Sequence, residues 1–314
     1  MNNAFTAPHF QSPELARTWL EGQRWPDGPI CSHCGIINHA YKTKKPGWYR
    51  CAEKECRKDF TVTTGTLMER SHIALNKWLM AFYLIASSKK GISSHQLHRA
   101  LNVDYKSAWF MTHRIREAMR DGGLGGPLGG PDGSGIVEVD ETYFGKPEVA
   151  YVSKQRGDRP YIKGNKKRNS RAIVALVERG GNIRSFHVAV ADKETVTKIV
   201  KENISKEARL MTDESNLYFG ANAHFASHET VKHSAKEYAR GDVHTNTIEG
   251  SFSIFKRGMK GIYQHCKEKH LHRYLAEFDF RYNHRVGLGF SDIDRTKLAI
   301  KGIEGKRLTY HQTH

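Results

Sequence analysis

The chain has 314 residues and a formal net charge of +17, with 38% hydrophobic and 10% aromatic residues. This length predicts about two domains, and the composition excludes an intrinsically disordered chain. The sequence has no apolar run long enough to span a bilayer and no signal-peptide pattern, so we expect a protein that stays in the cytoplasm. The positive charge favours nucleic acid as the partner, because no basic amphipathic helix suits the alternative, an anionic membrane surface.

The first predicted elements are a short helix capped by Ser12 and a cysteine-rich module after it. The pairs C-S-H-C and C-A-E-K-E-C are separated by 16 residues. Two such knuckles place four thiolates around one Zn²⁺, and four cysteines leave no open position for water, so we expect a structural ion. His33 and His39 are alternative ligands. The predicted ligands of this zinc ribbon are Cys31, Cys34, Cys51 and Cys56, and its predicted packing residues are Trp48, Tyr49 and Phe60.

Residues 75–120 are predicted to be helical. Ser93 or Ser94 caps a first helix, and Asp104 caps a second one after a short turn. Two helices joined in this way resemble a DNA-binding helix-turn-helix, although an ordinary helical hairpin has the same pattern. The second helix is predicted to bury Ala108, Met111, Ile115 and Ala118 and to leave Lys106, Arg114, Arg116 and Arg120 off that face. We expect Lys106 and Arg114 to contact DNA.

Residues 122–135 contain eight Gly and two Pro and are predicted to form a flexible linker. Strands followed by mixed helices and strands indicate an α/β fold with one sheet covered by helices. The predicted strands are Ile136–Tyr143, Ala172–Val177, Ile183–Val190 and Leu210–Thr212, and the predicted helices are Asp192–Ser205 and most of 245–283. The predicted domains are 1–70 (helix and zinc ribbon), 71–121 (helix-turn-helix), 122–135 (linker), 136–290 (catalytic domain) and 291–314 (tail).

Three acidic residues lie where metal chemistry would need them. Asp140 falls near the end of the first predicted strand, and Asp213 follows another apolar run. Active sites of α/β sheets gather at strand ends. Glu249 belongs to a predicted helix. A lone acid after a strand is also a common turn residue or helix cap, and Glu141 and Glu214 are competitors for the first two positions.

The helix that contains Glu249 has two stripes of residues. Glu249 and Lys256 are seven residues apart, which is nearly two turns, so they project on one side. A carboxylate and a cation placed in this way can hold a metal ion and a phosphate. Gly258 and Gly261 are expected to end or bend the helix. The apolar stripe is Ile248, Phe252, Phe255, Met259 and Ile262, and the polar stripe is Asn246, Glu249, Ser253 and Lys256.

The order of these acids, with 35 residues between Asp213 and Glu249 and Lys256 seven further on, resembles DDE transposases and retroviral integrases. The strings V-D-E-T-Y-F-G, T-D-E-S, H-T-N-T-I-E-G-S-F-S-I-F-K-R-G and H-L-H-R-Y-L-A-E-F-D-F-R-Y-N-H-R are similar to one group of bacterial insertion-sequence transposases. That group carries a zinc ribbon ahead of an RNase H-like catalytic domain. The resemblance covers roughly residues 15–290.

The resemblance implies an enzyme that binds the terminal inverted repeats of its element, cleaves DNA and joins the 3′-OH ends to target DNA. It implies two Mg²⁺ or Mn²⁺ ions held by Asp140, Asp213 and Glu249, with Lys256 binding the phosphate of the transposon end. Some relatives use Asn as the third ligand, so Asn246 competes with Glu249; it could also orient Glu249 or contact DNA. The expected partner is double-stranded DNA, bound at the nucleoid by a homodimer or a larger synaptic complex.

Two rival functions remain open: a catalytically silent DNA-binding regulator derived from a transposase, and an RNase H-like nuclease that never joins ends. His244, five residues before Glu249, is a candidate for catalysis. Residues 151–171 contain eight Lys or Arg against one Asp and are expected to bind phosphate, although a solvated insertion has the same composition. The further predicted DNA-binding residues are Lys163, Lys166, Lys167, Arg168, Arg257 and Lys260.

Overall fold

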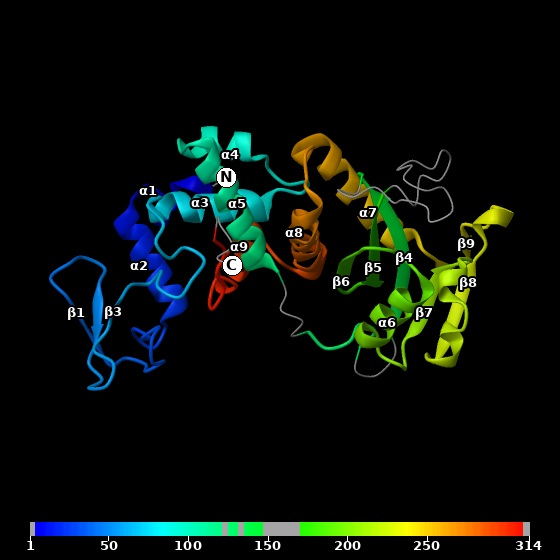
Figure 1. Ribbon diagram of the computed structural model, residues 1–314, viewed down its shortest axis with the longest axis horizontal. Coiled ribbons are helices and arrows are strands. Elements are labelled where there is room, and N and C mark those ends of the chain that lie inside the picture. Colours follow the sequence, from blue (N-terminus) through cyan, green and yellow to red (C-terminus); the bar gives the residue numbers. More distant parts are fainter. Residues whose placement is uncertain (1–3, 121–124, 131–134, 147–169, 310–314) are drawn as a thin grey trace, which may run out of the picture. The chain divides into compact units, whose positions relative to one another are not determined.

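Residues 1–120 and 290–314 build one unit of the computed structural model, and residues 121–289 build a second one (Figure 1). The structure describes residues 4–120, 125–130, 135–146 and 170–309. Each unit has its own buried core. In the described part of the chain, none of the helices combines the length and hydrophobicity needed to traverse a lipid bilayer.

The first unit begins with two α-helices, α1 (Pro8–Gln11) and α2 (Pro13–Arg24), which precede the predicted ribbon. Ser12 caps α2 by accepting a hydrogen bond from the Leu15 N–H at 3.2 Å. The rings of Tyr49 and Phe60 pack with Trp25, at centroid distances of 5.4 to 5.8 Å. Trp48, the third predicted packing residue, is half-buried, with the Lys45 ammonium over its ring. The ribbon contains an antiparallel sheet of β1 (Ala40–Lys42), β2 (Tyr49–Cys51) and β3 (Asp59–Phe60).

The predicted pair of helices is present, with its caps. Ser93 forms a capping box with Gln96, and Asp104 accepts a hydrogen bond from the Ser107 N–H at 3.0 Å. The four apolar positions predicted on the second helix are buried. Arg116 was expected off this face but is only 1% exposed, and its guanidinium donates to the Thr112 hydroxyl at 3.1 Å. The pair is α4 (Ser94–Leu101) and α5 (Tyr105–Met119), and α3 (Leu75–Ser87) precedes it in the predicted helical segment.

The residues predicted as a C-terminal tail are instead part of the first unit. Asp292–Lys301 form helix α9, which packs against α3 and α5. A capping box between Ser291 and Asp294 begins the helix, and Ala299 and Ile300 are buried. The apolar face of α9 therefore completes the core of the helical unit, which its short and strongly polar sequence did not indicate.

The second unit contains a five-stranded mixed sheet in the order β6-β5-β4-β7-β8. Strands β4, β5 and β6 form an antiparallel meander, and β7 and β8 run parallel to β4. This sheet, flanked by helices, confirms the predicted RNase H-like α/β fold. The strands are β4 (Ile136–Phe144), β5 (Arg171–Glu178), β6 (Ile183–Val188), β7 (Arg209–Asp213) and β8 (Ser227–Val231), and a separate small hairpin pairs β9 (Ala239–Arg240) with β10 (Val243–His244).

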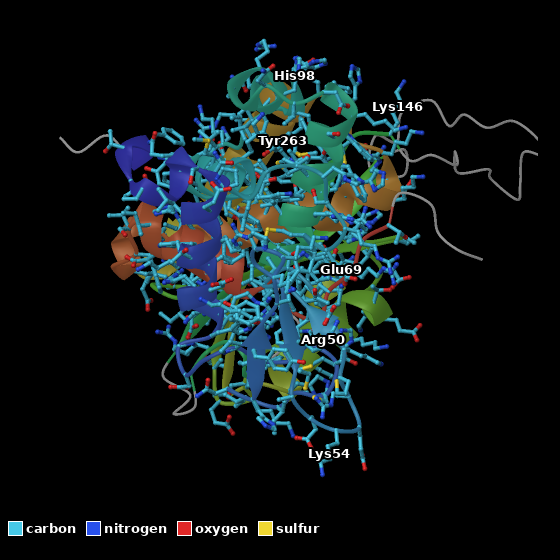
Figure 2. All side chains as sticks on the ribbon, turned by 90° about the vertical axis from the view of Figure 1, so that its left-hand side faces the viewer. Arg50, Lys54, Glu69, His98, Lys146 and Tyr263 are labelled. Carbon is cyan, nitrogen blue, oxygen red and sulfur yellow. The ribbon has the colours of Figure 1, made fainter. Side chains whose placement is uncertain are left out.

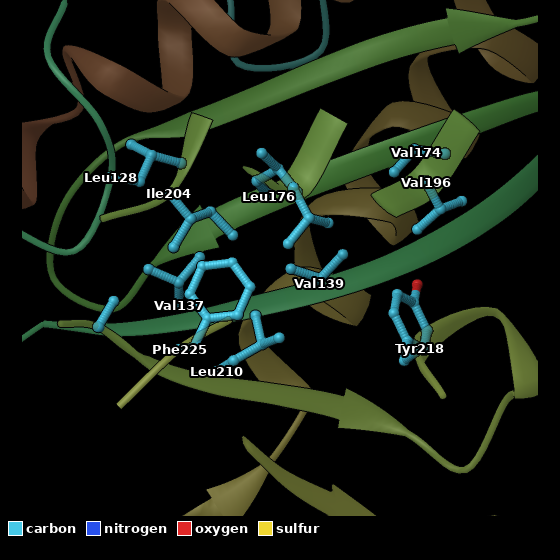
Figure 3. Close-up of a cluster of buried hydrophobic side chains, with 12 residues drawn as sticks. Leu128, Val137, Val139, Val174, Leu176, Val196, Ile204, Leu210, Tyr218 and Phe225 are labelled. Atoms are coloured by element: carbon cyan, nitrogen blue, oxygen red, sulfur yellow. The ribbon is translucent and has the colours of Figure 1, made fainter. Parts of the chain in front are cut away.

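Helices cover both faces of this sheet. On one face, Val137 and Val139 of β4 pack with α6 (Lys193–Asn203), as Figure 3 shows. On the other face, Ile173 and Ala175 of β5 pack against α7 (Asn246–Gly258) and α8 (Leu271–Asn283). Strand alternation thus gives each face its own hydrophobic core.

One residue of the predicted linker belongs to this fold. Leu128 is 3% exposed and lies among the core residues on the α6 side (Figure 3). Its backbone N–H bonds to the Asn203 carbonyl, and its carbonyl accepts the Ser205 N–H, both at 2.8 Å. The described residues 125–130 are therefore anchored at the end of α6, because a single leucine among glycines still gains free energy from burial.

Helix α8 covers the backbone of the edge strand β6. The Asp279 carboxylate accepts the Ser185 N–H and hydroxyl, both at 2.7 Å, and the Asn283 side chain bonds both backbone groups of Ile183. These contacts occupy N–H and C=O groups that an open sheet edge would offer to another chain.

Candidate active site and metal centre

A cleft of about 540 Å³ opens in the second unit, between the middle of β4, the end of β7 and helix α7 (elements in Figure 1). Asp140 was expected near the end of its strand, but it is the central residue of β4. It contains the three predicted metal-binding carboxylates and three basic side chains of one helical segment. Its lining residues are Asp140, Glu141, Thr142, Asp213, His233, Glu249, Phe252, Ser253, Lys256, Arg257 and Lys260.

Asp140 lies on the face of β4 toward α7, because its neighbour Val139 packs into the opposite core. Its carboxylate accepts the backbone N–H of Glu141 at 2.7 Å. Burial, together with the negative charges of Glu141 and Asp213, raises the pKa of Asp140 to about 8. This accumulation of negative charge fits a divalent cation, which prefers carboxylate oxygens and offsets their repulsion.

Asp213 ends β7 at the position that corresponds to Asp140. The last paired residues of the two parallel strands are Glu138 and Met211, and both acids lie two residues beyond them. The Ser215 N–H donates to the Asp213 carboxylate at 3.0 Å. The register of the sheet therefore brings the two carboxylates to one edge.

Of the two acids that compete with Asp140 and Asp213, Glu141 lines the cleft and Glu214 does not. The Glu214 carboxylate accepts the N–H and hydroxyl of Ser234, both at 2.8 Å, and these bonds lower its pKa. Glu214 is not among the residues that line the cleft. Glu141 does line it and accepts the Tyr218 hydroxyl at 3.0 Å, so Glu141 stays a neighbour of the predicted triad.

Glu249 lies in the first turn of α7, with Lys256 on the same side two turns later, as the spacing predicted. The Glu249 side chain is about half exposed, and its Oε1 lies 3.7 Å from Nε2 of His233. The α-helix ends at Gly258 and continues as a π-helical turn from Met259 to Tyr263, which places Lys260 in the cleft as well.

Asn246 is the first residue of α7, is exposed, and is not among the residues that line the cleft. Orientation of Glu249, one of the roles predicted for Asn246, falls to Thr245. The buried Thr245 hydroxyl donates to Oε1 of Glu249 at 3.1 Å. The geometry therefore favours Glu249 over Asn246 as the candidate for the third metal ligand.

The remaining predicted DNA-binding residues differ in how they are placed. Arg257 and Lys260 line the cleft, and Lys106 is exposed on α5. Arg114 is half-buried: its guanidinium lies over the Phe110 ring and donates to the Leu308 carbonyl at 3.3 Å. These contacts leave Arg114 less available to DNA than predicted. Lys163, Lys166, Lys167 and Arg168 lie outside the described residues.

The four ribbon cysteines form a candidate zinc site. None is in a disulfide, and Sγ–Sγ distances are 3.7 Å for Cys31–Cys56 and 3.6 Å for Cys34–Cys51. Tetrahedral Zn²⁺ with Zn–S bonds of about 2.3 Å spaces its sulfurs by about 3.8 Å, so the quartet fits a structural zinc. His33 is not needed as a ligand; its ring contacts the Asp59 carbonyl at 3.2 Å. Arg50 and Lys54 lie on the surface of this ribbon (Figure 2).

Among the described residues, only these cysteines bring three or more donor atoms within 4.8 Å of one another. The carboxylates of the cleft are spaced more widely. A closed four-ligand site and an open acidic cleft are therefore distinct in geometry as well as in chemistry.

Several residues around the cleft were not predicted. Glu138, on the same face of β4 as Asp140, is fully buried and bonded to Arg179 and to the start of α7. Tyr218 is buried beside Glu141. The alternation of polar residues at Glu138, Asp140 and Thr142 was a signal for the first of these, because it marks one face of the strand as polar. Nothing local indicated Tyr218.

Comparison with known protein families agrees with these observations. Residues 133–283 match the ISXO2-like transposase domain, and residues 11–59 match the transposase zinc-ribbon domain. The chain is also 29% identical over 283 residues to an uncharacterized protein in transposable element ISH50 of Halobacterium salinarum. That similarity covers 87% of this chain and 91% of the relative.

Proposed function

We propose that this chain, an insertion-sequence transposase with a zinc ribbon and an ISXO2-like transposase domain, cleaves DNA at the ends of its element. It then joins those ends to target DNA. The observation that carries this proposal is the cleft, where Asp140, Asp213 and Glu249 face three cations of the α7 segment. An acidic pocket edged by lysine and arginine suits a phosphodiester, whose phosphate needs positive charge and whose reaction needs a metal site.

The proposed reaction has two displacements at phosphorus. In the first, the oxygen of water bonds to the phosphorus at the end of the element, the bond to the 3′ oxygen breaks, and a 3′-OH and a 5′-phosphate are released. In the second, that 3′-OH bonds to a target phosphorus, and a target 3′ oxygen leaves. Two Mg²⁺ or Mn²⁺ ions held by Asp140, Asp213 and Glu249 would supply activation of the attacking oxygen and stabilisation of the leaving one.

The chain's own basic residues bind and orient the DNA in this scheme. Lys256 grips the phosphate of the transposon end, and Arg257 and Lys260 extend the contact along the same strand. Burial next to other carboxylates raises the pKa of Asp140, so a cation that binds there would displace its proton. The zinc ribbon and the α4–α5 pair read the terminal repeats, with Lys106 on a phosphate.

Pairing two ends requires at least a dimer, and work on DNA implies a position at the nucleoid. The experiment that tests the function uses pure zinc-loaded protein, Mg²⁺ and a supercoiled plasmid that carries the element's own ends. Cleavage at the ends followed by joined products supports the transposase. Cleavage without joining supports the nuclease, and end binding without any cleavage supports the regulator.

A further inference from the structure

We infer that Glu138 is a positioning residue, which fixes the third acid of the cleft relative to the first. It lies on the strand that carries Asp140 and bonds the helix that carries Glu249. This inference deepens the proposed function and rests on it for the roles of those two acids. The contacts themselves belong to the described structure and can be tested without metal or DNA.

Glu138 is a carboxylate with no exposed side-chain surface, two residues before Asp140 on the same face of β4. A buried carboxylate is costly unless it is paired and hydrogen-bonded. Glu138 meets both conditions. Arg179 Nε donates to its Oε1 at 2.6 Å, and the Thr247 hydroxyl donates to the same oxygen at 2.9 Å.

The second oxygen of Glu138 caps helix α7. Its Oε2 accepts the Ile248 N–H at 2.9 Å, which is one of the first-turn donors that a helix leaves without an internal partner. The residue that precedes the helix, Thr245, supplies no such cap, because its hydroxyl bonds Glu249 instead. A negative charge at a helix N-terminus is also favoured by the helix dipole. A strand residue over 100 positions away thus serves as the cap of α7.

Arg179 extends this link to the segment that leads into α7. It follows directly after β5, and its guanidinium bonds the carbonyls of Asp242 and His244 at 2.6 and 2.8 Å, besides Glu138. His244 Nδ1 lies 3.3 Å from Oε1 of Glu138. His244, a candidate for catalysis on sequence grounds, is not among the residues that line the cleft, so we place it in this network instead.

This hydrogen-bond network restrains the position of Glu249 relative to Asp140. Asp140 is two residues from Glu138 along one strand, and Glu249 is one residue from the Ile248 N–H that Glu138 holds. Loss of the cap frees the first turn of α7 and with it the Glu249 carboxylate. Residues that orient metal ligands cost about 10–100-fold in metal affinity when they are changed.

The test compares Glu138→Gln with Glu277→Gln in the full-length, zinc-loaded protein. Glu277 is the matched control, because it too is fully buried and paired with an arginine, Arg281, but lies on α8 outside the cleft. Without added Mn²⁺, hydrogen exchange of residues 245–252 should be faster in Glu138→Gln than in wild type and unchanged in Glu277→Gln. In calorimetric titration with Mn²⁺, we expect affinity to fall about 10–100-fold in Glu138→Gln and to be unchanged in the control.

A milder variant keeps the test valid if Glu138→Gln does not fold. Thr247→Val removes a single hydrogen bond to Glu138, and we expect Mn²⁺ affinity to fall about fivefold. If the Glu138 and Thr247 variants have the hydrogen exchange rates and the Mn²⁺ affinity of wild type, the inference is overturned and the proposed function is unaffected. Wild-type protein that binds no Mn²⁺ beyond its zinc would overturn the proposed function, whereas the exchange data would still decide whether Glu138 holds α7.

Discussion

The four cysteines of the ribbon lie between positions 31 and 56, whereas Asp140 and Glu249, two acids of the cleft, are 109 positions apart. The cysteine donors lie within 4.8 Å of one another, and the carboxylates are spaced more widely. In the ribbon, neighbouring strands and knuckles bring the ligands together. In the cleft, two strands and a helix must first form the sheet and its cover. We therefore expect zinc binding to stabilise the ribbon locally, whereas the three acids of the cleft are positioned by a sheet and helices that have their own buried cores.

The largest effect that would sharpen this contrast is loss of a ribbon ligand. We expect Cys51→Ser to abolish zinc binding and unfold the ribbon, because a structural zinc site contributes on the order of 10 kcal/mol of folding free energy. Zinc content by mass spectrometry and limited proteolysis of residues 1–70 would show it. Binding to transposon ends should fall with the ribbon, whereas Mn²⁺ binding in the cleft should persist.

Cys266→Ser is the matched control for that variant, because Cys266 is the fifth cysteine and lies outside the ribbon. It should keep one zinc per chain and the proteolysis pattern of wild type. Intact ribbon structure in zinc-free Cys51→Ser would break the contrast.

A smaller effect is expected from the basic side of the cleft. Lys256→Ala should weaken binding of an end-containing duplex about tenfold and reduce the salt dependence of that binding by about one counterion, because one phosphate contact is lost. Fluorescence anisotropy at several salt concentrations measures both. Lys198→Ala on α6, exposed on the other face of the sheet, is the control. Equal losses for the two variants would show that Lys256 acts only through the protein's overall charge.

The smallest effect concerns stability. Because the pKa of Asp140 is raised to about 8, the folded protein holds this proton more tightly than the unfolded chain. Its contribution to stability is therefore present at low pH and is lost as the pH rises from about 4 through 8. Without added Mg²⁺ or Mn²⁺, Asp140→Asn should raise the melting temperature by a few degrees at pH 9 and leave it unchanged at pH 4.

With that result, the two sites would differ in the sign of their effect on stability, because loss of a ribbon cysteine is expected to lower the melting temperature and loss of Asp140 to raise it. Scanning calorimetry at both pH values gives the answer. A melting temperature that falls at pH 9 would mean that Asp140 stabilises the fold, as the ribbon cysteines are expected to do.

Much of the fold follows from local signals in the sequence. Ser12, Ser93 and Asp104 cap their helices as predicted, and the apolar runs around Val139 and Leu210 form buried strands. These features depend on residues that are neighbours in the chain, so the local sequence predicts them. The spacing of Glu249 and Lys256 belongs to the same class.

The features that sequence reasoning missed depend on distant partners. Arg116 is buried because α5 packs inside a helical unit that α9 completes, and Leu128 is buried because the end of α6 receives it. From the sequence alone, Glu138 would be taken for a surface charge, because its partners Arg179 and the first turn of α7 are distant in the chain. Burial of a polar group is determined by its long-range contacts, which residue type and spacing do not contain.

We propose that Asp140, Asp213 and Glu249 act together as one metal-dependent site for DNA joining. The most direct measurement is a strand-transfer assay with precleaved ends and Mg²⁺, using Asp140→Asn, Asp213→Asn and Glu249→Gln beside wild type. We predict that each variant binds the ends as wild type does and joins them at least about 1,000-fold more slowly, as expected when a two-metal site is lost. Joining at the wild-type rate by any one of the three variants would show that the three acids do not form one metal-dependent site.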